Sequence, residues 1–497
     1  MRDKYSGADH VAAKALFLSI LILYGSAAAQ NMVWSASYGG TYNEGGYACL
    51  SLPDSGYVAV GSTFSFGSGD YDVYLLRLDS LGNILWSRTY GGPASDMGHD
   101  IQTTPDGGFI IVGTTSSYGA GGADLCLWRT DSAGQLQWTR TFGGAQTDEG
   151  WSIRATYDRG FVVCGSTSSS GAGYADLFVI KVDSLGNSDW AQTFGGSGGE
   201  SGYAIRQTRD SGYVAVGATG SFGEGYSSIY AVRVSPMGDS LWAKTYGGAR
   251  ADVGYSVEVT PDGGFVLVGV TASYGLGYYD AYLVRTDADG TQLWDKTYGG
   301  ARDDYGYSVS ITPDGFLLAG TTESSGAGAS DVFVVKADPV GTQVWSHTYG
   351  GNKADYCRTI LKNRLSQFVA VGSTYSYGVG GSDLYMVALM ADGQTPVDDW
   401  SGSLPEGFDL TQNYPNPFNA TTRIEFSVGF RTNVRLTLYN ILGQEVRTWL
   451  IPRATEGSSS IDWDGTDATG RPVATGVYLY RIEAGPFVQS RKMVLLK

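Results

Sequence analysis

Residues 86–92 read Trp-Ser-Arg-Thr-Tyr-Gly-Gly, and this stretch decides the fold because it returns almost unchanged along most of the chain. The recurrent tryptophans are Trp34, Trp86, Trp138, Trp190, Trp242, Trp294 and Trp345. Successive tryptophans lie 52 residues apart five times and 51 residues apart once. Self-similarity at such a period is typical of a repeat architecture, so residues 30–395 are predicted to form one array.

Each repeat contains two pairs of short, β-branched apolar runs. In the repeat that spans residues 98–142, one pair of runs flanks Pro105-Asp106-Gly107-Gly108 and the other surrounds Asp131-Ser132-Ala133-Gly134. Both patterns are hairpin signals. The array shows no sustained helical periodicity. Four strands per unit, this period and seven units predict an all-β fold, a seven-bladed β-propeller of four-stranded blades.

The phase of the repeat predicts how the ring closes. Trp34 opens the array with a fourth strand that has no first three, while residues 356–391 supply three strands without a fourth. We therefore expect the strand around Met32 to Tyr38 to pair as the outer strand of the last blade. Such closure removes two exposed sheet edges, which are aggregation hazards.

The recurrent tryptophans are expected to dock each blade onto the next. A large flat side chain at the same point of every unit can bury about 150–250 Å² against its neighbour. The spacing from Asp79 through Gly82 to Trp86 recurs along the array, with Ser235 in the Asp place once. It resembles the tryptophan-docking motif of quinoprotein-type propellers, which implies that this Trp packs against the adjoining blade.

The resemblance to quinoprotein-type propellers does not imply that this chain binds a quinone cofactor. The vicinal cysteines and metal-binding acids of quinone sites have no counterpart in this sequence, so we expect no cofactor and no metal. The unit is also similar to bacterial secreted propeller repeats typified by DGGFxxxGST and WxxTYGG, a family poor in known activities. That likeness covers the whole array and implies a fold rather than an activity.

Composition and the first residues both indicate export. Charged residues are only 16% of the chain, there are 73 Gly and 34 Tyr, and the net charge of −16 opposes binding to nucleic acid. Arg2, Lys4 and Lys14 precede an apolar run at 15–24, and Ala27 to Ala29 offer a cleavage site. Residues 1–29 are therefore predicted to be a Sec signal peptide. The apolar run is too short to span a bilayer, and no transmembrane segment is expected.

The four cysteines show no disulfide framework and are expected to be small buried side chains, with a Cys49–Cys357 pair left open because the first and seventh units would be neighbours. His99 and His347 stand apart from any recurrent Ser or Cys. No catalytic residue is predicted from these side chains.

Two sets of recurrent residues are candidates for a site. An acid follows the second Gly of each YGG by four residues and would form a ring near the channel entrance: Glu44, Asp96, Asp148, Glu200, Asp252, Asp304 and Asp355. Cation or polyol binding is one interpretation, and paired carboxylates could suggest glycoside hydrolysis. The favoured interpretation is structural, with each acid accepting backbone hydrogen bonds, because a catalytic site breaks symmetry and this ring does not.

Aromatic residues in the Gly-rich segments form the second set. They are Phe66, Tyr118, Phe222, Tyr274 and Tyr377. At one rim they could stack sugar rings or contact a protein, or they could pack over the blade ends.

After residue 395 the repeat stops, residues 396–410 read as a polar linker, and residues 411–497 predict a small immunoglobulin-like β-sandwich. This segment contains a recognisable set of residues: Tyr414, Pro415, Asn416, Pro417, Phe418, Asn419, Gly476, Val477, Tyr478 and the run from Lys492 to Lys497. In these residues it closely resembles the type A C-terminal sorting domain of the type IX secretion system. The resemblance implies passage through the outer membrane by the type IX machinery, followed by release or attachment at the cell surface.

Together these features predict an exported propeller that binds glycans or proteins at the cell surface or after secretion. A carbohydrate-active enzyme, either a glycoside hydrolase or a lyase, is the alternative. A structural adhesin or spacer is the third possibility.

Overall fold

The computed structural model describes residues 32–363, 367–390, 409–428, 432–440, 445–484 and 487–496. The chain divides into two compact units, Met1–Thr395 and Pro396–Lys497. Every regular element in the described residues is a β-strand. The expected signal peptide at 1–29, most of the expected linker at 396–410, and Lys497 lie outside the described residues.

The first unit consists of repeated four-stranded antiparallel sheets, and six of these sheets follow the chain order. The first two sheets are β2 (Glu44–Ser51), β3 (Tyr57–Thr63), β4 (Asp72–Leu78) and β5 (Ile84–Tyr90), then β6 (Asp96–Thr103), β7 (Phe109–Thr115), β8 (Asp124–Thr130) and β9 (Leu136–Phe142). The next two are β10 (Asp148–Ala155), β11 (Phe161–Thr167), β12 (Asp176–Val182) and β13 (Ser188–Phe194), then β14 (Glu200–Gln207), β15 (Tyr213–Thr219), β16 (Ser228–Val234) and β17 (Ser240–Tyr246). The last two are β18 (Asp252–Val259), β19 (Phe265–Thr271), β20 (Asp280–Thr286) and β21 (Gln292–Tyr298), then β22 (Asp304–Thr312), β23 (Gly315–Thr322), β24 (Asp331–Ala337) and β25 (Gln343–Tyr349).

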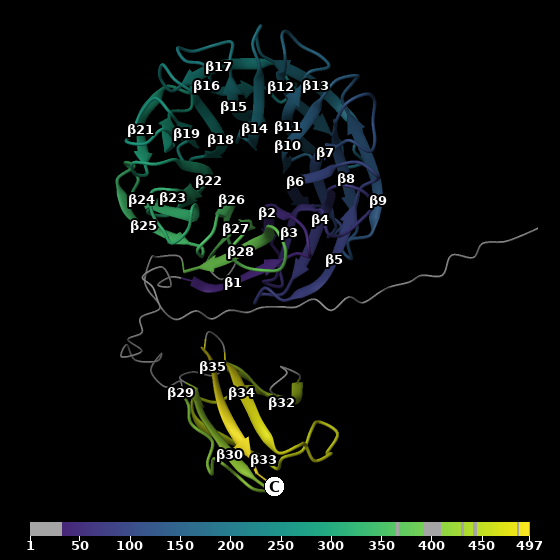
Figure 1. Cartoon of the computed structure of the whole chain (residues 1–497), viewed down its shortest axis with the longest axis vertical. Coiled ribbons are helices and arrows are strands. Elements are labelled where there is room, and N and C mark those ends of the chain that lie inside the picture. Colours follow the sequence, from purple (N-terminus) through teal and green to yellow (C-terminus); the bar gives the residue numbers. More distant parts are fainter. Residues whose placement is uncertain are drawn as a thin grey trace, which may run out of the picture. The chain divides into compact units, whose positions relative to one another are not determined.

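One further sheet joins the two ends of the array. It contains β26 (Asp355–Lys362), β27 (Phe368–Thr374) and β28 (Asp383–Leu389), and its fourth strand is β1 (Met32–Tyr38). β1 runs antiparallel to β28, with Trp34 opposite Ala388 and Tyr38 opposite Leu384. The strand pairing expected from the phase of the repeat is therefore present, and Figure 1 shows purple β1 beside green β28.

The core lies between neighbouring sheets, and the recurrent tryptophans help to form it. Each Trp packs against an apolar cluster that includes an aromatic residue at the start of the second strand in the following sheet. For example, the rings of Trp242 and Phe265 meet edge to face with centroids 5.9 Å apart. A Cβ atom on Gly290 would lie 2.8 Å from the Trp242 ring, so glycine is needed where the indole covers the next turn.

The tyrosine of the WxxTYGG stretch makes a second contact with the next sheet. The Tyr90 hydroxyl donates to the Gly134 carbonyl at 2.7 Å, and equivalent bonds run from Tyr38, Tyr246 and Tyr298 to the corresponding carbonyls. Phe142 and Phe194 occupy this position in two copies and have no hydroxyl to donate.

The first glycine of YGG is required by two carboxylates that converge on it. A Cβ atom on Gly91 would lie 1.9 Å from Asp72 Oδ1 and 2.7 Å from Asp96 Oδ2, closer than any non-bonded contact allows. The same arrangement surrounds Gly39, Gly143, Gly195, Gly299 and Gly350. The glycine therefore recurs in these repeats for a steric reason.

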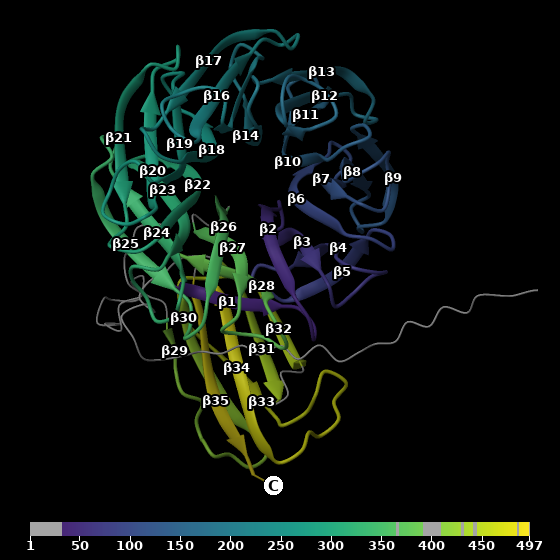
Figure 2. The same ribbon diagram turned by 45° about the horizontal axis from the view of Figure 1, so that its top comes forward.

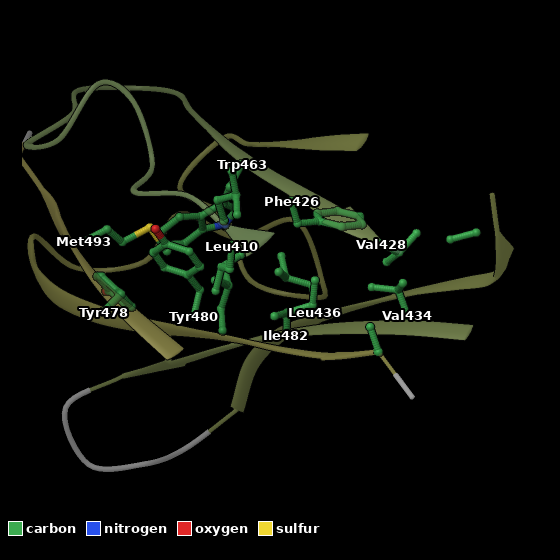
Figure 3. Close-up of a cluster of buried hydrophobic side chains, with 14 of the residues drawn as sticks. Leu410, Phe426, Val428, Val434, Leu436, Trp463, Tyr478, Tyr480, Ile482 and Met493 are labelled. Atoms are coloured by element: carbon green, nitrogen blue, oxygen red, sulfur yellow. The ribbon is translucent and has the colours of Figure 1, made fainter. Parts of the chain in front are cut away.

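The second unit is a two-sheet sandwich. One sheet contains β29 (Asp409–Leu410), β30 (Thr422–Val428) and β33 (Gly457–Trp463). The other contains β31 (Thr432–Asn440), β32 (Glu445–Ala454), β34 (Gly476–Ala484) and β35 (Phe487–Leu495). Figure 3 shows their shared core, in which Trp463 lies near Tyr478 while Phe426 and Leu436 fill the space between the sheets.

The two ends of the sorting-domain resemblance meet in this unit. Phe418 is buried against Trp463, with ring centroids 5.5 Å apart. Its backbone NH donates to the Val494 carbonyl at 2.9 Å, and the Val494 NH donates to Asn416 Oδ1 at 2.9 Å. The YPNPF segment is therefore bonded to the C-terminal strand, whereas Tyr414 is 82% exposed.

The four cysteines are free and buried, so the Cys49–Cys357 disulfide does not form in this structure. Among the described residues, no helix is long and apolar enough to cross a membrane.

Candidate functional site: the axial channel

The acids expected near the channel entrance are bonded to their own turns. Each accepts a hydrogen bond of 2.7–2.8 Å from the backbone NH four residues earlier, as Gly92 donates to Asp96 Oδ2. Their side chains are 0–1% exposed. These carboxylates therefore hold the turn after YGG and present almost no surface to a ligand.

A second carboxylate lies beside most of these acids, at the start of the third strand. Burial raises the pKa of Asp383 to about 7, and the neighbouring charge of Glu44 adds to the shift. Burial and the equivalent neighbour also raise the pKa of Asp72, Asp124, Asp176, Asp280 and Asp331. In the sheet of β14–β17 this position is Ser228, so that sheet lacks the pair.

The five predicted rim aromatics are half-exposed and rest on their own sheets. The rings of Phe66, Phe222, Tyr274 and Tyr377 lie over a tyrosine of the third strand, with centroids 5.5–5.7 Å apart. The Tyr118 hydroxyl donates to the Gly91 carbonyl at 2.7 Å. More exposed aromatics, missed in the sequence, are Tyr174, Tyr226 and Tyr278 at 84%, 91% and 66%.

A cavity of about 350 Å³ lies at the axis of the first unit. Its lining comes from the first strand of every sheet: β2, β6, β10, β14, β18, β22 and β26. These strands surround the centre of the ring in Figures 1 and 2. We call this cavity the axial channel.

One repeat position, three residues after each acid, supplies a belt of side chains around the channel. Its members are Tyr47, His99, Trp151, Tyr203, Tyr255, Tyr307 and Arg358, and we call them the channel belt. Neighbouring rings from Tyr47 to Tyr307 touch in order, with centroids 4.0–5.6 Å apart. The Arg358 guanidinium continues the series, 4.7 Å from the centroid of the Tyr307 ring.

His99 is the buried member of the belt. It stacks on Trp151 with centroids 4.0 Å apart and an interplanar angle of 8°. Burial lowers the pKa of His99 to about 4, a hydrogen bond to Gly150 opposes this shift, and the charge of Arg358 adds to it. The imidazole is therefore neutral at pH 7, and Nδ1 donates its proton to the Gly150 carbonyl at 2.7 Å.

Charged side chains line the channel beside the belt. Arg154 Nη1 pairs with Asp100, and Arg206 Nη2 lies 2.7 Å from Glu258 Oε1. Each of these arginines is thus neutralised by a carboxylate of a neighbouring sheet. Among the described residues, Arg358 forms no such ion pair.

Nothing in the described residues resembles a metal centre, because no group of three or more His, Cys, Asp or Glu side chains is gathered. The channel instead offers aromatic faces, tyrosine hydroxyls and, besides the two paired arginines, the guanidinium of Arg358. Such a surface can stack a ring and bond its polar substituents.

The channel belt was missed in the sequence although a signal exists. Aligning the repeats on the acid places an aromatic residue or Arg358 three positions later in every copy. The first strand of each sheet lies nearest the axis. Successive side chains of a strand point to opposite faces, and this alternation alone does not tell which set of side chains points into the cavity.

Comparison with known proteins identifies part of the second unit. Residues 418–485 match the family of the FlgD Ig-like domain. A segment of 115 residues is 29% identical to "Regulatory protein FlaEY" of Caulobacter vibrioides, covering 20% of this chain. The chain spans only 12% of the length of that curated relative.

Solved structures with some likeness to this chain include three with TM-scores below 0.5. PorZ of Porphyromonas gingivalis, described as a surface component of the type-IX secretion system, is 11% identical with a TM-score of 0.31, over 91% of this chain and 51% of its own. Puromycin hydrolase is 15% identical with a TM-score of 0.45, over 78% and 59%. A family 43 arabinoxylan arabinofuranohydrolase from Bacillus subtilis is 12% identical with a TM-score of 0.26, over 80% and 95%. Likeness at this level carries no argument about activity.

Proposed function

We propose that the first unit is a closed seven-bladed propeller that binds glycans at its axial channel. The channel belt carries this proposal, because contiguous aromatic rings with hydroxyl groups suit the flat faces and hydroxyls of sugars. The cavity of about 350 Å³ falls within the usual range of small-ligand sites, about 300–1,000 Å³. Pairing of β1 with β28 supports a closed ring.

We further propose that export depends on both ends of the chain. The signal peptide at 1–29 would direct Sec export, and residues 411–497 would direct transfer by the type IX machinery to the surface or medium. The hydrogen bonds between the YPNPF segment and the C-terminal strand support this role, because they bring the two matching segments together in the second unit.

Sorting is tested in a bacterium that has a type IX system by comparing the full chain with a form lacking residues 411–497. The full chain should be accessible to external protease or appear in the medium. The truncated chain should stay in the periplasm. Equal surface delivery of the two forms would overturn the sorting proposal.

Binding is tested by glycan-array measurements with the purified full chain and two sets of variants. Trp151→Ala with Tyr203→Ala alters the channel belt, whereas Tyr118→Ala, Phe222→Ala and Tyr274→Ala together alter the rim. Loss of glycan binding in the belt variant, with binding retained in the rim variant, would support the proposed site. Loss in the rim variant alone would move the site to the rim.

A protein ligand, a carbohydrate-active enzyme and a spacer remain alternatives to glycan binding. The acids at the strand starts are buried and hydrogen-bonded to their turns, so they give little support to hydrolysis by paired carboxylates. Absence of any array signal for the unchanged chain would overturn glycan binding and favour the protein-ligand or spacer alternative.

A further inference from the structure

The channel belt breaks the symmetry of the ring at one position. Six of its members are aromatic, while the last sheet supplies Arg358, which is exposed to the cavity. The repeat does not require this residue, because the other six sheets form with an aromatic side chain at the same place. Arg358 is therefore a candidate for a specific role.

The neighbouring charges leave Arg358 as the uncompensated one. Arg154 and Arg206 are paired with Asp100 and Glu258, so these four charges cancel. His99 lies in the belt as a neutral imidazole whose Nδ1 is bonded to a backbone carbonyl. Its ring contacts are Tyr47 and Trp151, both uncharged. Glu258 lies outside the lining but pairs with Arg206, so the lining together with this partner carries one net positive charge. Glu149, which accepts a hydrogen bond from Trp151 Nε1 at 3.2 Å, is also outside the lining.

The acids above the belt do not cancel this charge by direct contact. They are 0–1% exposed and accept hydrogen bonds from their own turns. The Arg358 guanidinium instead lies over the ring of Tyr307, with its Cζ atom 4.7 Å from the ring centroid. A cation–π contact of this kind stabilises the guanidinium and leaves its NH groups able to donate to an anion.

We propose that the axial channel recognises a sugar that carries a carboxylate, with Arg358 binding the carboxylate and the aromatic belt holding the sugar ring. This inference rests on the proposed glycan-binding function and names its ligand class. A single planar guanidinium matches a carboxylate in a two-pronged hydrogen-bonded pair. The lining residues Tyr47, Tyr203, Tyr255 and Tyr307 carry hydroxyl groups, which are chemically suited to bond sugar hydroxyls.

The charge of the channel favours a carboxylate over a phosphate group. A phosphate monoester carries close to two negative charges at pH 7, and the channel offers one uncompensated cation. The belt also suits a ring-shaped body rather than a bare ion, because six of its seven members are aromatic. A uronic acid at the end of an oligosaccharide combines both features.

The test compares two trisaccharides that differ at a single carboxyl group, using calorimetric titration of the purified full chain. The acidic probe has two galactose units and one terminal galacturonate, and the neutral probe is its carboxyl-reduced counterpart, in which a hydroxymethyl group replaces the carboxylate. We expect the unchanged protein to bind the acidic probe at least about tenfold more tightly, the scale of a charge-assisted hydrogen-bonded pair. Raising the salt concentration should reduce this preference.

Variants assign the preference to one residue. Arg358→Gln should bind both probes equally, and Arg358→Lys should retain part of the preference because it keeps the charge but not the planar fork. Arg140→Gln is the control, because Arg140 is also exposed and lies over an aromatic ring, 5.3 Å from the Trp138 centroid on outer strand β9. It should bind both probes as the unchanged protein does.

The possible failures are separable. Equal binding of the two probes by the unchanged protein would overturn the acidic-sugar inference while leaving glycan binding intact. A preference that survives Arg358→Gln would overturn the assignment to Arg358. Binding of both probes that persists in Trp151→Ala with Tyr203→Ala would instead overturn the axial site itself.

Discussion

The outer and inner strands of the same sheets show opposite patterns of variation. The outer strands repeat Trp at one position in every copy, and that indole packs against the next sheet. The first strands present Tyr, His, Trp or Arg at one position, and those side chains line a cavity. The uniform residues of the first unit thus serve the contacts between sheets, whereas the varied position lines the cavity to which we assign ligand binding.

The largest expected effect comes from the uniform set. Gly91→Ala places a methyl group 1.9 Å from Asp72 Oδ1 and 2.7 Å from Asp96 Oδ2. Displacing two buried, hydrogen-bonded carboxylates should lower the free energy of unfolding by about 4 kcal/mol or more, measured by urea denaturation. Gly199→Ala is the matched control, because a Cβ atom there meets nothing within 4 Å. Similar losses in both variants would contradict the steric explanation.

A smaller loss of stability should distinguish the tryptophans of the outer strands from Trp151 in the channel belt. Trp242→Ala removes a half-buried indole from the contact with Phe265 and should cost about 3 kcal/mol of unfolding free energy. Trp151→Ala should cost less stability but weaken glycan binding. If Trp242→Ala weakened binding as much as Trp151→Ala, the proposed division between outer and inner strands would fail.

The next effect depends on pH. Since the pKa of Asp383 is raised to about 7, the folded chain keeps a proton that the unfolded chain loses near pH 4. Stability should therefore fall as the pH rises from about 4 to about 7. Asp383→Asn should flatten this part of the profile of melting temperature against pH. Asp289→Asn, an exposed change of the same charge, should leave the slope as it was.

The smallest expected effect tests a single hydroxyl. Tyr90→Phe leaves the Gly134 carbonyl without its donor and should cost about 1 kcal/mol of unfolding free energy. Phe142→Tyr is the reverse change, because the natural phenylalanine stands where other copies carry the donor. It should stabilise the chain by a similar or smaller amount in urea denaturation. Unchanged stability in Tyr90→Phe, or a loss of stability in Phe142→Tyr, would show that the hydroxyl is not what couples neighbouring sheets.

Repetition made the fold predictable, because hairpin signals and an incomplete repeat at each end specify strands and their partners without any knowledge of side-chain contacts. The β1–β28 pairing follows from the single strand at Trp34 and the missing fourth strand after residues 356–391. The site was less predictable. Phe222 and Tyr274 were noticed through their Gly-rich loops, yet their rings rest on their own sheets. His99 looked isolated in the sequence, and Arg358 was not singled out there. Only convergence of strands from distant repeats brings those two side chains to one channel.

The pairing of β1 with β28 also sets an order of assembly. Ribosomes make β1 first, but β28 is the last described strand of the same unit to emerge. Until then β1 has no partner, and an unpaired strand edge can associate with other chains. During synthesis the final strand pairing of this unit is therefore delayed until both of its ends have been made.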